Sequence, residues 1–152
     1  MKSPEHTITI LRTIDASAAD LYAAWTDPTI MRRWMARDVD ADVRVGGHYR
    51  NEVDAGDLGT FIHTGEYLEL EPGRRIVQTF GGEPTEPGPY RDERLEVTLH
   101  SLSPTRTELT FTDGWDAADM SEEDRTAARD AWTEWLDLLE KLFADRAQSA
   151  GA

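Results

Sequence analysis

The chain has 152 residues, which favours a single domain over 1–152, with a folded core over about 7–145 and a flexible tail over 146–152. It contains no cysteine, which excludes disulfides, thiolate metal sites and cysteine nucleophiles. A formal net charge of −14 disfavours nucleic acid and anionic lipid as partners, and no apolar run approaches the ~20 residues of a membrane span, so we expect neither nucleic-acid binding nor membrane insertion.

The chain begins with a predicted strand and a short helix. Residues 7–14 are rich in β-branched side chains, as is typical of a strand. Ser17 and Asp20 have the spacing of a capping box, which predicts a helix that ends near Thr26. Trp25 then falls on the apolar side of this helix, and we expect it to pack between helix and sheet.

A second short helix is predicted directly after the first. Asp27 can cap free backbone N–H groups, and Pro28 suits the first helical position. Ile30, Met31 and Trp34 then share one face, which we expect to point inward. Of these three side chains, Trp34 is the one that we expect to reach an interior cavity.

From residue 38 the apolar period changes from that of a helix to that of a strand. Polar and apolar residues alternate over 38–45, and Gly46-Gly47 has the composition of a tight hairpin turn. Turn-forming residues then separate five further runs, at about 48–54, 58–70, 74–81, 90–102 and 106–113. The pattern predicts an antiparallel meander.

The last element is a long helix. Ser121 and Asp124 have the spacing of another capping box. An apolar stripe at helical spacing follows, formed by Trp132, Trp135, Leu136, Leu139, Leu142 and Phe143. We therefore predict an α+β fold in which a seven-stranded antiparallel sheet wraps around this helix, with a cavity between them.

Five segments of the sequence carry a resemblance to a known family: ASAADLYAAWTDPTIMRRW, VRVGGHYR, TGEYLELEPGRRIVQTF, VTLHSLSPTRTELTFT and the tryptophan-bearing final helix. The chain resembles the helix-grip fold of the SRPBCC superfamily, which includes START domains and birch-pollen-allergen-like proteins. More narrowly, it is similar to the domain family named for the activator of the heat-shock-protein-90 ATPase (AHSA-type). The resemblance implies the fold more directly than the function.

Aromatic and polar side chains of the sheet and helices are the candidates for a ligand site. Large rigid rings can wall a cavity that a few polar groups complete. The candidate cavity residues are Trp34, Tyr49, His63, Tyr67, Phe80, Trp115, Trp132 and Trp135. The loops at about 54–57, 81–89 and 113–120 fall at one end of the meander, where we expect the cavity to open with Trp115 near its rim.

Charged residues give no comparable signal. Asp38, Asp40 and Asp42 alternate as on the wet face of a strand and lack the glycine and glutamate of a calcium loop, so we expect no metal and no cofactor. We find no nucleotide or hydrolase motif and name no catalytic residue. Glu66, Arg94 and Glu108 lie within strands, and the sequence leaves their faces open.

Three functions are compatible with these features. We favour a protein that binds an apolar or aromatic small molecule, similar to a lipid or a polyketide. The alternatives are a cyclase, dehydratase or hydrolase that uses polar groups such as His63, Tyr67 or Arg94 in the same cavity, and a co-chaperone-like partner protein. The start MKSPEHTITI lacks the pattern of a signal peptide, so we expect a cytoplasmic protein.

Overall fold

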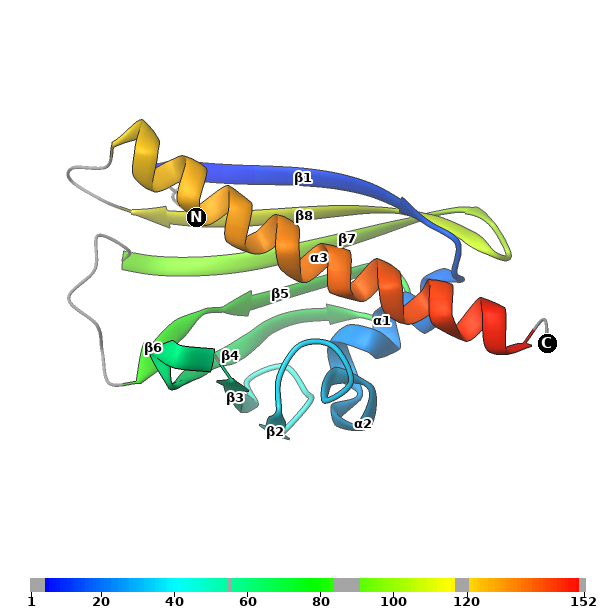
Figure 1. Ribbon diagram of the computed structural model, residues 1–152, viewed down its shortest axis with the longest axis horizontal. Helices are drawn as coiled ribbons and strands as arrows, with labels where there is room; N and C mark the ends of the chain where they lie inside the picture. Colours follow the sequence, from blue (N-terminus) through cyan, green and yellow to red (C-terminus); the bar gives the residue numbers. More distant parts are fainter. Residues whose placement is uncertain (1–4, 55, 84–90, 117–120, 151–152) are drawn as a thin grey trace.

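The computed structural model describes residues 5–54, 56–83, 91–116 and 121–150. A curved antiparallel sheet forms one layer, and the long helix α3 (Glu122–Ala150) lies across one of its faces (Figure 1). The short helices α1 (Ala18–Thr26) and α2 (Pro28–Met31) follow the first strand and lie together near one end of the sheet. The predicted α+β helix-grip fold is therefore confirmed.

The sheet is built from strands that are all antiparallel to their neighbours. They are β1 (His6–Ile14), β2 (Asp38–Ala41), β3 (His48–Asp54), β4 (Thr60–Glu71), β5 (Arg75–Thr79), β6 (Gly81–Glu83), β7 (Arg91–Ser103) and β8 (Arg106–Asp116), with the 3-10 turn η1 (Gly56–Leu58) before β4. Seven of them follow the order β1-β8-β7-β5-β4-β3-β2 across the sheet. The predicted seven-stranded path is thus present, and the first and last strands along the chain are neighbours within it.

The short strand β6 departs from the predicted pattern, which placed a long loop from residue 81 onward. Strand β5 pairs with β4 only over the second half of β4. The first half therefore has a free side, and β6 fills it, with Thr64 opposite Gly81 and Ile62 opposite Glu83. The rest of the predicted loop lies outside the described residues.

All three predicted helix caps are present in the structure. The Ser17 hydroxyl accepts a hydrogen bond from the Asp20 N–H at 3.0 Å, and the Asp27 carboxylate accepts one from the Thr29 N–H at 3.0 Å. The Ser121 hydroxyl accepts another from the Asp124 N–H at 3.1 Å. These bonds satisfy N–H groups that have no partner inside a helix, which explains why the helices begin where they do.

Helix α3 also contacts the free edge of the sheet through arginine side chains. Strand β1 is an edge strand, so one side of its backbone has no neighbouring strand. The Arg125 guanidinium donates to the Thr7 carbonyl at 3.2 Å, and the Arg129 guanidinium donates to the Thr9 carbonyl at 3.4 Å. The helix therefore covers backbone acceptors that another strand would otherwise pair with.

A reverse contact runs from β1 to the middle of α3. Ile8, Ile10 and Ile14 alternate into the core, while Arg12, at the remaining inward position, reaches the helix instead. Its guanidinium donates to the carboxylates of two residues one turn apart, Asp137 at 2.8 Å and Glu140 at 3.0 Å. This pairing links the middle of α3 to the edge strand β1.

Candidate functional site

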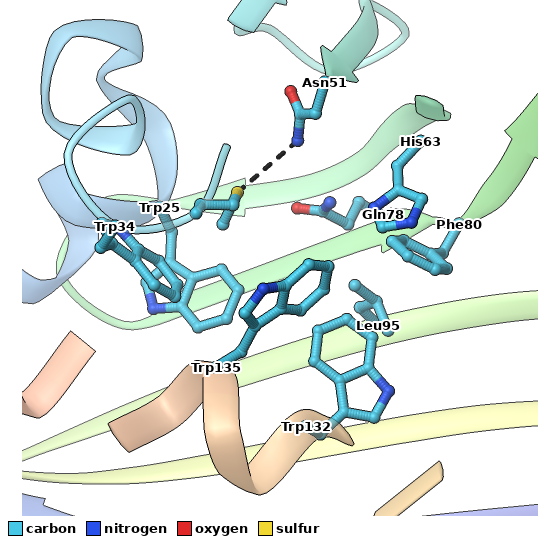
Figure 2. Close-up of a pocket in the computed structure, with 10 residues that line it drawn as sticks. Trp25, Trp34, Asn51, His63, Gln78, Phe80, Leu95, Trp132 and Trp135 are labelled. Carbon is cyan, nitrogen blue, oxygen red and sulfur yellow. Dashed lines mark hydrogen bonds between the residues drawn. The ribbon is translucent and has the colours of Figure 1, made fainter. Parts of the chain in front are cut away.

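A small cavity lies between the concave face of the sheet and α3 (Figure 2). Its volume is about 20 Å³, which is enough for roughly one water molecule. The lining residues are Trp25, Trp34, Met35, Asn51, His63, Gln78, Phe80, Leu95, Trp132 and Trp135. The cavity is thus mostly aromatic, with one imidazole and two side-chain amides as polar groups.

Five of the eight residues predicted for a cavity line this one: Trp34, His63, Phe80, Trp132 and Trp135. Trp25 joins them, although the sequence placed it in the helix–sheet core. Both descriptions hold, because Trp25 is only 2% exposed and one part of its ring still faces the cavity.

The register of the strands explains why the polar lining residues meet. His63 on β4 lies directly opposite Asn51 on β3, and Gln78 on β5 lies directly opposite Leu95 on β7. Directly opposed residues of an antiparallel pair point to the same face of the sheet. The concave face therefore presents three neutral polar side chains beside the indoles of α3.

Four rings form a continuous wall on one side of the cavity. The His63 and Phe80 ring centroids are 4.6 Å apart, and those of His63 and Trp135 are 5.4 Å apart. Trp132 closes the wall, with its centroid 4.7 Å from Trp135 and 5.4 Å from Phe80. All four of these pairs are edge-on or tilted, the arrangements that aromatic rings prefer.

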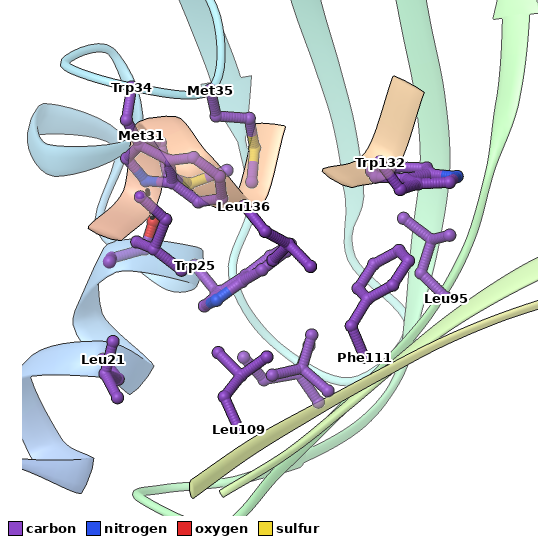
Figure 3. Close-up of a cluster of buried hydrophobic side chains, with 14 of the residues drawn as sticks. Leu21, Trp25, Met31, Trp34, Met35, Leu95, Leu109, Phe111, Trp132 and Leu136 are labelled. Atoms are coloured by element: carbon purple, nitrogen blue, oxygen red, sulfur yellow. Dashed lines mark hydrogen bonds between the residues drawn. The ribbon is translucent and has the colours of Figure 1, made fainter. Parts of the chain in front are cut away.

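The opposite side of the cavity belongs to the hydrophobic core (Figure 3). The rings of Trp25 and Trp34 meet edge-on with centroids 4.9 Å apart, and the Trp34 indole N–H donates to the Ala24 carbonyl at 2.8 Å. Phe111 then links Trp25, at 6.1 Å, to Trp132, at 4.6 Å. Trp34 is therefore held by a buried hydrogen bond as well as by packing.

His63 is electrically neutral in this setting. Burial lowers the pKa of its imidazole to about 4, because the apolar surroundings disfavour the charged form. The ring therefore offers one N–H donor and one nitrogen acceptor at neutral pH.

We expect this imidazole to make stability depend on pH in the acidic range. The folded-state pKa of His63 lies below the ordinary value of 6.5, so the unfolded chain binds the proton more readily. The His63 contribution is present above about pH 6.5 and is lost as the pH falls towards 4, by up to about 3 kcal/mol in the free energy of unfolding. Urea unfolding of the wild type and of His63→Gln from pH 4 to 7 measures the difference, and parallel curves for the two proteins would contradict it.

Two polar atoms of the lining residues have no hydrogen-bond partner among the described residues. Asn51 is 4% exposed, and its amide N–H donates weakly to the Met35 sulfur at 3.5 Å while its side-chain oxygen is unpaired. The indole N–H of Trp25 is also unpaired. Unpaired buried groups cost free energy, so each would be stabilised by a suitable partner.

Two carboxyl groups, which the sequence analysis did not single out, lie behind the wall of rings. Asp113 is 1% exposed, and its carboxylate accepts a hydrogen bond from the Trp132 indole N–H at 2.8 Å. Glu93 adjoins it, and burial, followed by its hydrogen bond to Asp113 and the Asp113 charge, raises the pKa of Glu93 to about 10. Burial raises the pKa of Asp113 as well, against the hydrogen bonds to Glu93 and Trp132, which lower it. The two adjacent carboxyl groups hold one proton between them, so the pair carries one negative charge.

Alternation along the strands contains a signal for this pair. On β8, Leu109 and Phe111 point inward, so Asp113 does as well. On β7, Leu95 points inward, and counting back two residues reaches Glu93. Arg94, Glu108 and Glu66, the residues whose faces the sequence left open, neighbour inward-facing residues and therefore point to the other face of the sheet.

Tyr49 and Tyr67 are buried but do not line the cavity. The Tyr49 hydroxyl donates to the Thr79 carbonyl at 2.6 Å, so its ring crosses strand β4. Glycine at position 65 permits this crossing, because an added Cβ would collide with the Tyr49 ring and the Thr79 carbonyl. The two tyrosine rings pack on each other at 5.4 Å and serve the core beside the cavity.

Trp115 lies in a strand, and its predicted place in a loop is therefore wrong. Strand β8 extends to Asp116 because β1 continues to pair with it, and His6 stands opposite Trp115. The Trp115 ring is fully buried, stacks on the His6 ring at 5.9 Å and does not line the cavity. Residues 117–120, the rest of that predicted loop, lie outside the described residues.

No group of three or more histidine, aspartate and glutamate side chains within the described ranges is arranged to hold a metal ion. Nor does any helix among those residues combine the length and the apolar character that crossing a bilayer requires.

Comparisons with known proteins agree with this architecture. The family model described as "Activator of Hsp90 ATPase homolog 1-like protein" matches residues 15–144. A solved structure of a protein from Chromobacterium violaceum is 27% identical and matches with a TM-score of 0.73, covering 90% of this chain and 95% of that one. No protein with a curated function matches the chain.

Two structures with lower sequence identity also share the fold. An HSP90 activator from Plasmodium falciparum is 19% identical with a TM-score of 0.70, over 91% of this chain and 96% of that one. The Aha1 dimer from Colwellia psychrerythraea is 17% identical with a TM-score of 0.71, over 89% of this chain and 93% of that one. At this identity, both likenesses show the fold alone.

Proposed function

The chain belongs to the family of activator of Hsp90 ATPase homolog 1-like proteins, and we propose that it binds a small molecule. The proposed ligand is apolar or aromatic and lies between the sheet and α3. The fold of this family supports a ligand-binding domain in general. The observation that carries the proposal is the wall of four rings, His63, Phe80, Trp132 and Trp135, in a cavity that two residues with unpaired polar atoms also line.

The small size of the cavity sets a condition on this proposal. A volume of about 20 Å³ cannot hold a drug-sized molecule, so binding requires part of the wall to move. Seven lining residues are buried, whereas His63, Phe80 and Trp135 are half-buried. The ligand therefore enters beside these three rings, and Phe61, 39% exposed on the same strand as His63, continues the apolar surface outward.

The direct test is a ligand screen read by tryptophan fluorescence. Four of the five tryptophans line the cavity, so a bound ligand changes their emission. We expect saturable changes with members of a lipid and aromatic polyketide library at micromolar concentrations. The proposal fails if no compound changes the emission and the cavity stays closed in a structure solved with the best candidates.

We expect Trp135→Ala to weaken ligand binding more than it weakens folding. The ring is half-buried and contacts His63 and Trp132, so its loss removes one aromatic surface from the ligand. The dissociation constant should rise about tenfold, which corresponds to ~1.4 kcal/mol. Leu138→Ala on the same helix is the matched control, because Leu138 is 46% exposed and does not line the cavity, and it should change affinity less than about twofold. Equal effects of the two substitutions would place the ligand elsewhere.

A co-chaperone-like role is the second candidate function. It is supported by the family match and by the likeness of the fold to the Plasmodium HSP90 activator. The test is the ATPase rate of the heat-shock-protein-90 homologue from the same cell, measured with and without the chain. An unchanged rate, together with no complex in size-exclusion chromatography, would rule this role out.

The enzyme alternative receives less support from the lining. Among the described residues no aspartate, glutamate, lysine or arginine lines the cavity. Arg94 points to the other face of the sheet and Tyr67 lies outside the lining. His63 is then the single titratable side chain in contact with a bound molecule.

A further inference from the structure

The cavity combines an uncharged lining with a buried negative charge behind it. No described lining residue bears a charge at neutral pH, since His63 is neutral and the other polar groups are amides. One negative charge lies directly behind the lining, on the Asp113 carboxylate bonded to Trp132. A buried charge normally has an opposite partner.

No such partner acts on Asp113 within the described part of the chain. The influences on the pKa of this carboxyl group are burial and the hydrogen bonds to Glu93 and Trp132, with no cationic side chain among them. The interior therefore carries a net negative charge next to an aromatic wall. The formal net charge of −14 for the whole chain has the same sign and favours the approach of cations.

The aromatic wall itself attracts positive charge. The faces of indole and phenyl rings carry negative partial charge, and a group of such rings is the usual protein site for methylated ammonium ions. Trp132 donates its N–H to a carboxylate, which makes its ring a better electron donor. Trp25, Trp34, Phe80 and Trp135 complete the group of rings.

Building on the proposed function, we propose that the ligand carries a quaternary ammonium group, which sits among the indoles of the cavity with the Asp113 carboxylate as its counter-charge. A primary ammonium would need strong hydrogen-bond acceptors, and no described lining residue is a carboxylate; the neutral acceptors there belong to Asn51, His63 and Gln78. A quaternary ammonium needs none, because its surface is made of methyl groups. The apolar part of the molecule then extends past the half-buried rings His63, Phe80 and Trp135.

The test compares two probes that differ in charge alone. Choline and 3,3-dimethylbutan-1-ol have the same shape, with nitrogen in one replaced by carbon in the other. Both are titrated into the full chain at constant ionic strength, where exposed charges are largely screened beyond about 8 Å at 0.15 M salt. Tryptophan fluorescence reports binding, and we expect choline to bind about tenfold more tightly.

Two variants test the role of the buried charge. Glu93→Gln keeps the Asp113 charge, because a glutamine amide can donate to the carboxylate as the acid did. The double substitution Glu93→Gln with Asp113→Asn removes the charge and retains an acceptor for the Trp132 indole. The single variant should keep the preference for choline, and the double variant should lose it. Circular dichroism and binding of the uncharged probe show that each variant is folded.

Each outcome bears on one proposal or on both. Equal or weaker binding of choline overturns the ammonium inference, and an undiminished choline preference in the double variant overturns the role of Asp113. Binding of uncharged library compounds would leave the proposed function standing in both cases. If neither probe nor any library compound binds, both proposals fail.

Discussion

Replacing Trp25 with alanine should lower the free energy of unfolding by about 3–5 kcal/mol, the range for removal of a large buried aromatic side chain. Trp25 is 2% exposed and packs against Trp34 and Phe111, so the substitution leaves a void where helix α1 packs on the sheet. For a domain of this size the melting temperature should fall by roughly 10 °C. Thermal and urea unfolding followed by circular dichroism measure both quantities.

Two further variants identify the cause of this loss. Trp25→Phe keeps a ring and removes the unpaired indole N–H, so it should cost much less than the alanine substitution. Leu138→Ala removes an exposed side chain and should change stability by less than about 1 kcal/mol. If Trp25→Ala cost no more than Leu138→Ala, the core would not depend on this contact between α1 and the sheet.

Replacing Glu93 with glutamine should remove a large dependence of stability on alkaline pH. The folded-state pKa of Glu93, about 10, lies above the ordinary value of 4.5, so the folded protein holds a proton that the unfolded chain releases. The stability that this proton contributes is complete below about pH 4.5 and is lost as the pH rises towards 10. The slope of the unfolding free energy reaches at most ~1.4 kcal/mol per pH unit.

Urea unfolding between pH 7 and 9 isolates this effect, because the contribution of His63 is constant above pH 6.5 and the buried tyrosines, whose ordinary pKa is 10, contribute little below pH 9. The wild type should lose stability steadily over this range, whereas Glu93→Gln should keep a nearly constant value and exceed the wild type at pH 9. Glu134→Gln, on the exposed face of α3, is the matched control and should follow the wild type. A wild-type profile that is flat in this range would mean that Glu93 is already ionised.

The helices and the succession of strands along the chain could be predicted from the sequence because local chemistry decides them. The caps at Ser17, Asp27 and Ser121 depend on a side chain two or three residues from its partner, and all three are present. The extension of β8 through Trp115 depends instead on pairing with β1, more than 100 residues away. Strand β6 likewise exists because β5 leaves half of β4 unpaired.

The site was partly predictable for a related reason. Trp132 and Trp135 follow from the helical period, and His63 and Phe80 from their positions in the predicted strands. Tyr49 instead turns away to reach the Thr79 carbonyl over Gly65, a contact between residues distant in the sequence.

The buried carboxyl pair was missed because the decisive information is which face of a strand each residue occupies. A bulge lies between Arg91 and Arg94 in the pairing of β7 with β8. A one-residue change in register exchanges the two faces of a strand, so Glu93 and Arg94 exchange roles with it. Asp113 shows the same face as Phe111 and was therefore accessible to a count of alternation alone.

The arginines that join α3 to the edge of β1 bear on how the proposed ligand would enter and leave. If the helix had to lift away, Arg125 and Arg129 would release the Thr7 and Thr9 carbonyls and expose a strand that could recruit a second chain. Rotation of the half-buried rings of His63, Phe80 and Trp135 avoids that hazard and takes place within nanoseconds to microseconds rather than milliseconds. Binding and release of the proposed ligand should therefore be rapid, independent of protein concentration and insensitive to denaturant well below the unfolding midpoint, because no partial unfolding is required.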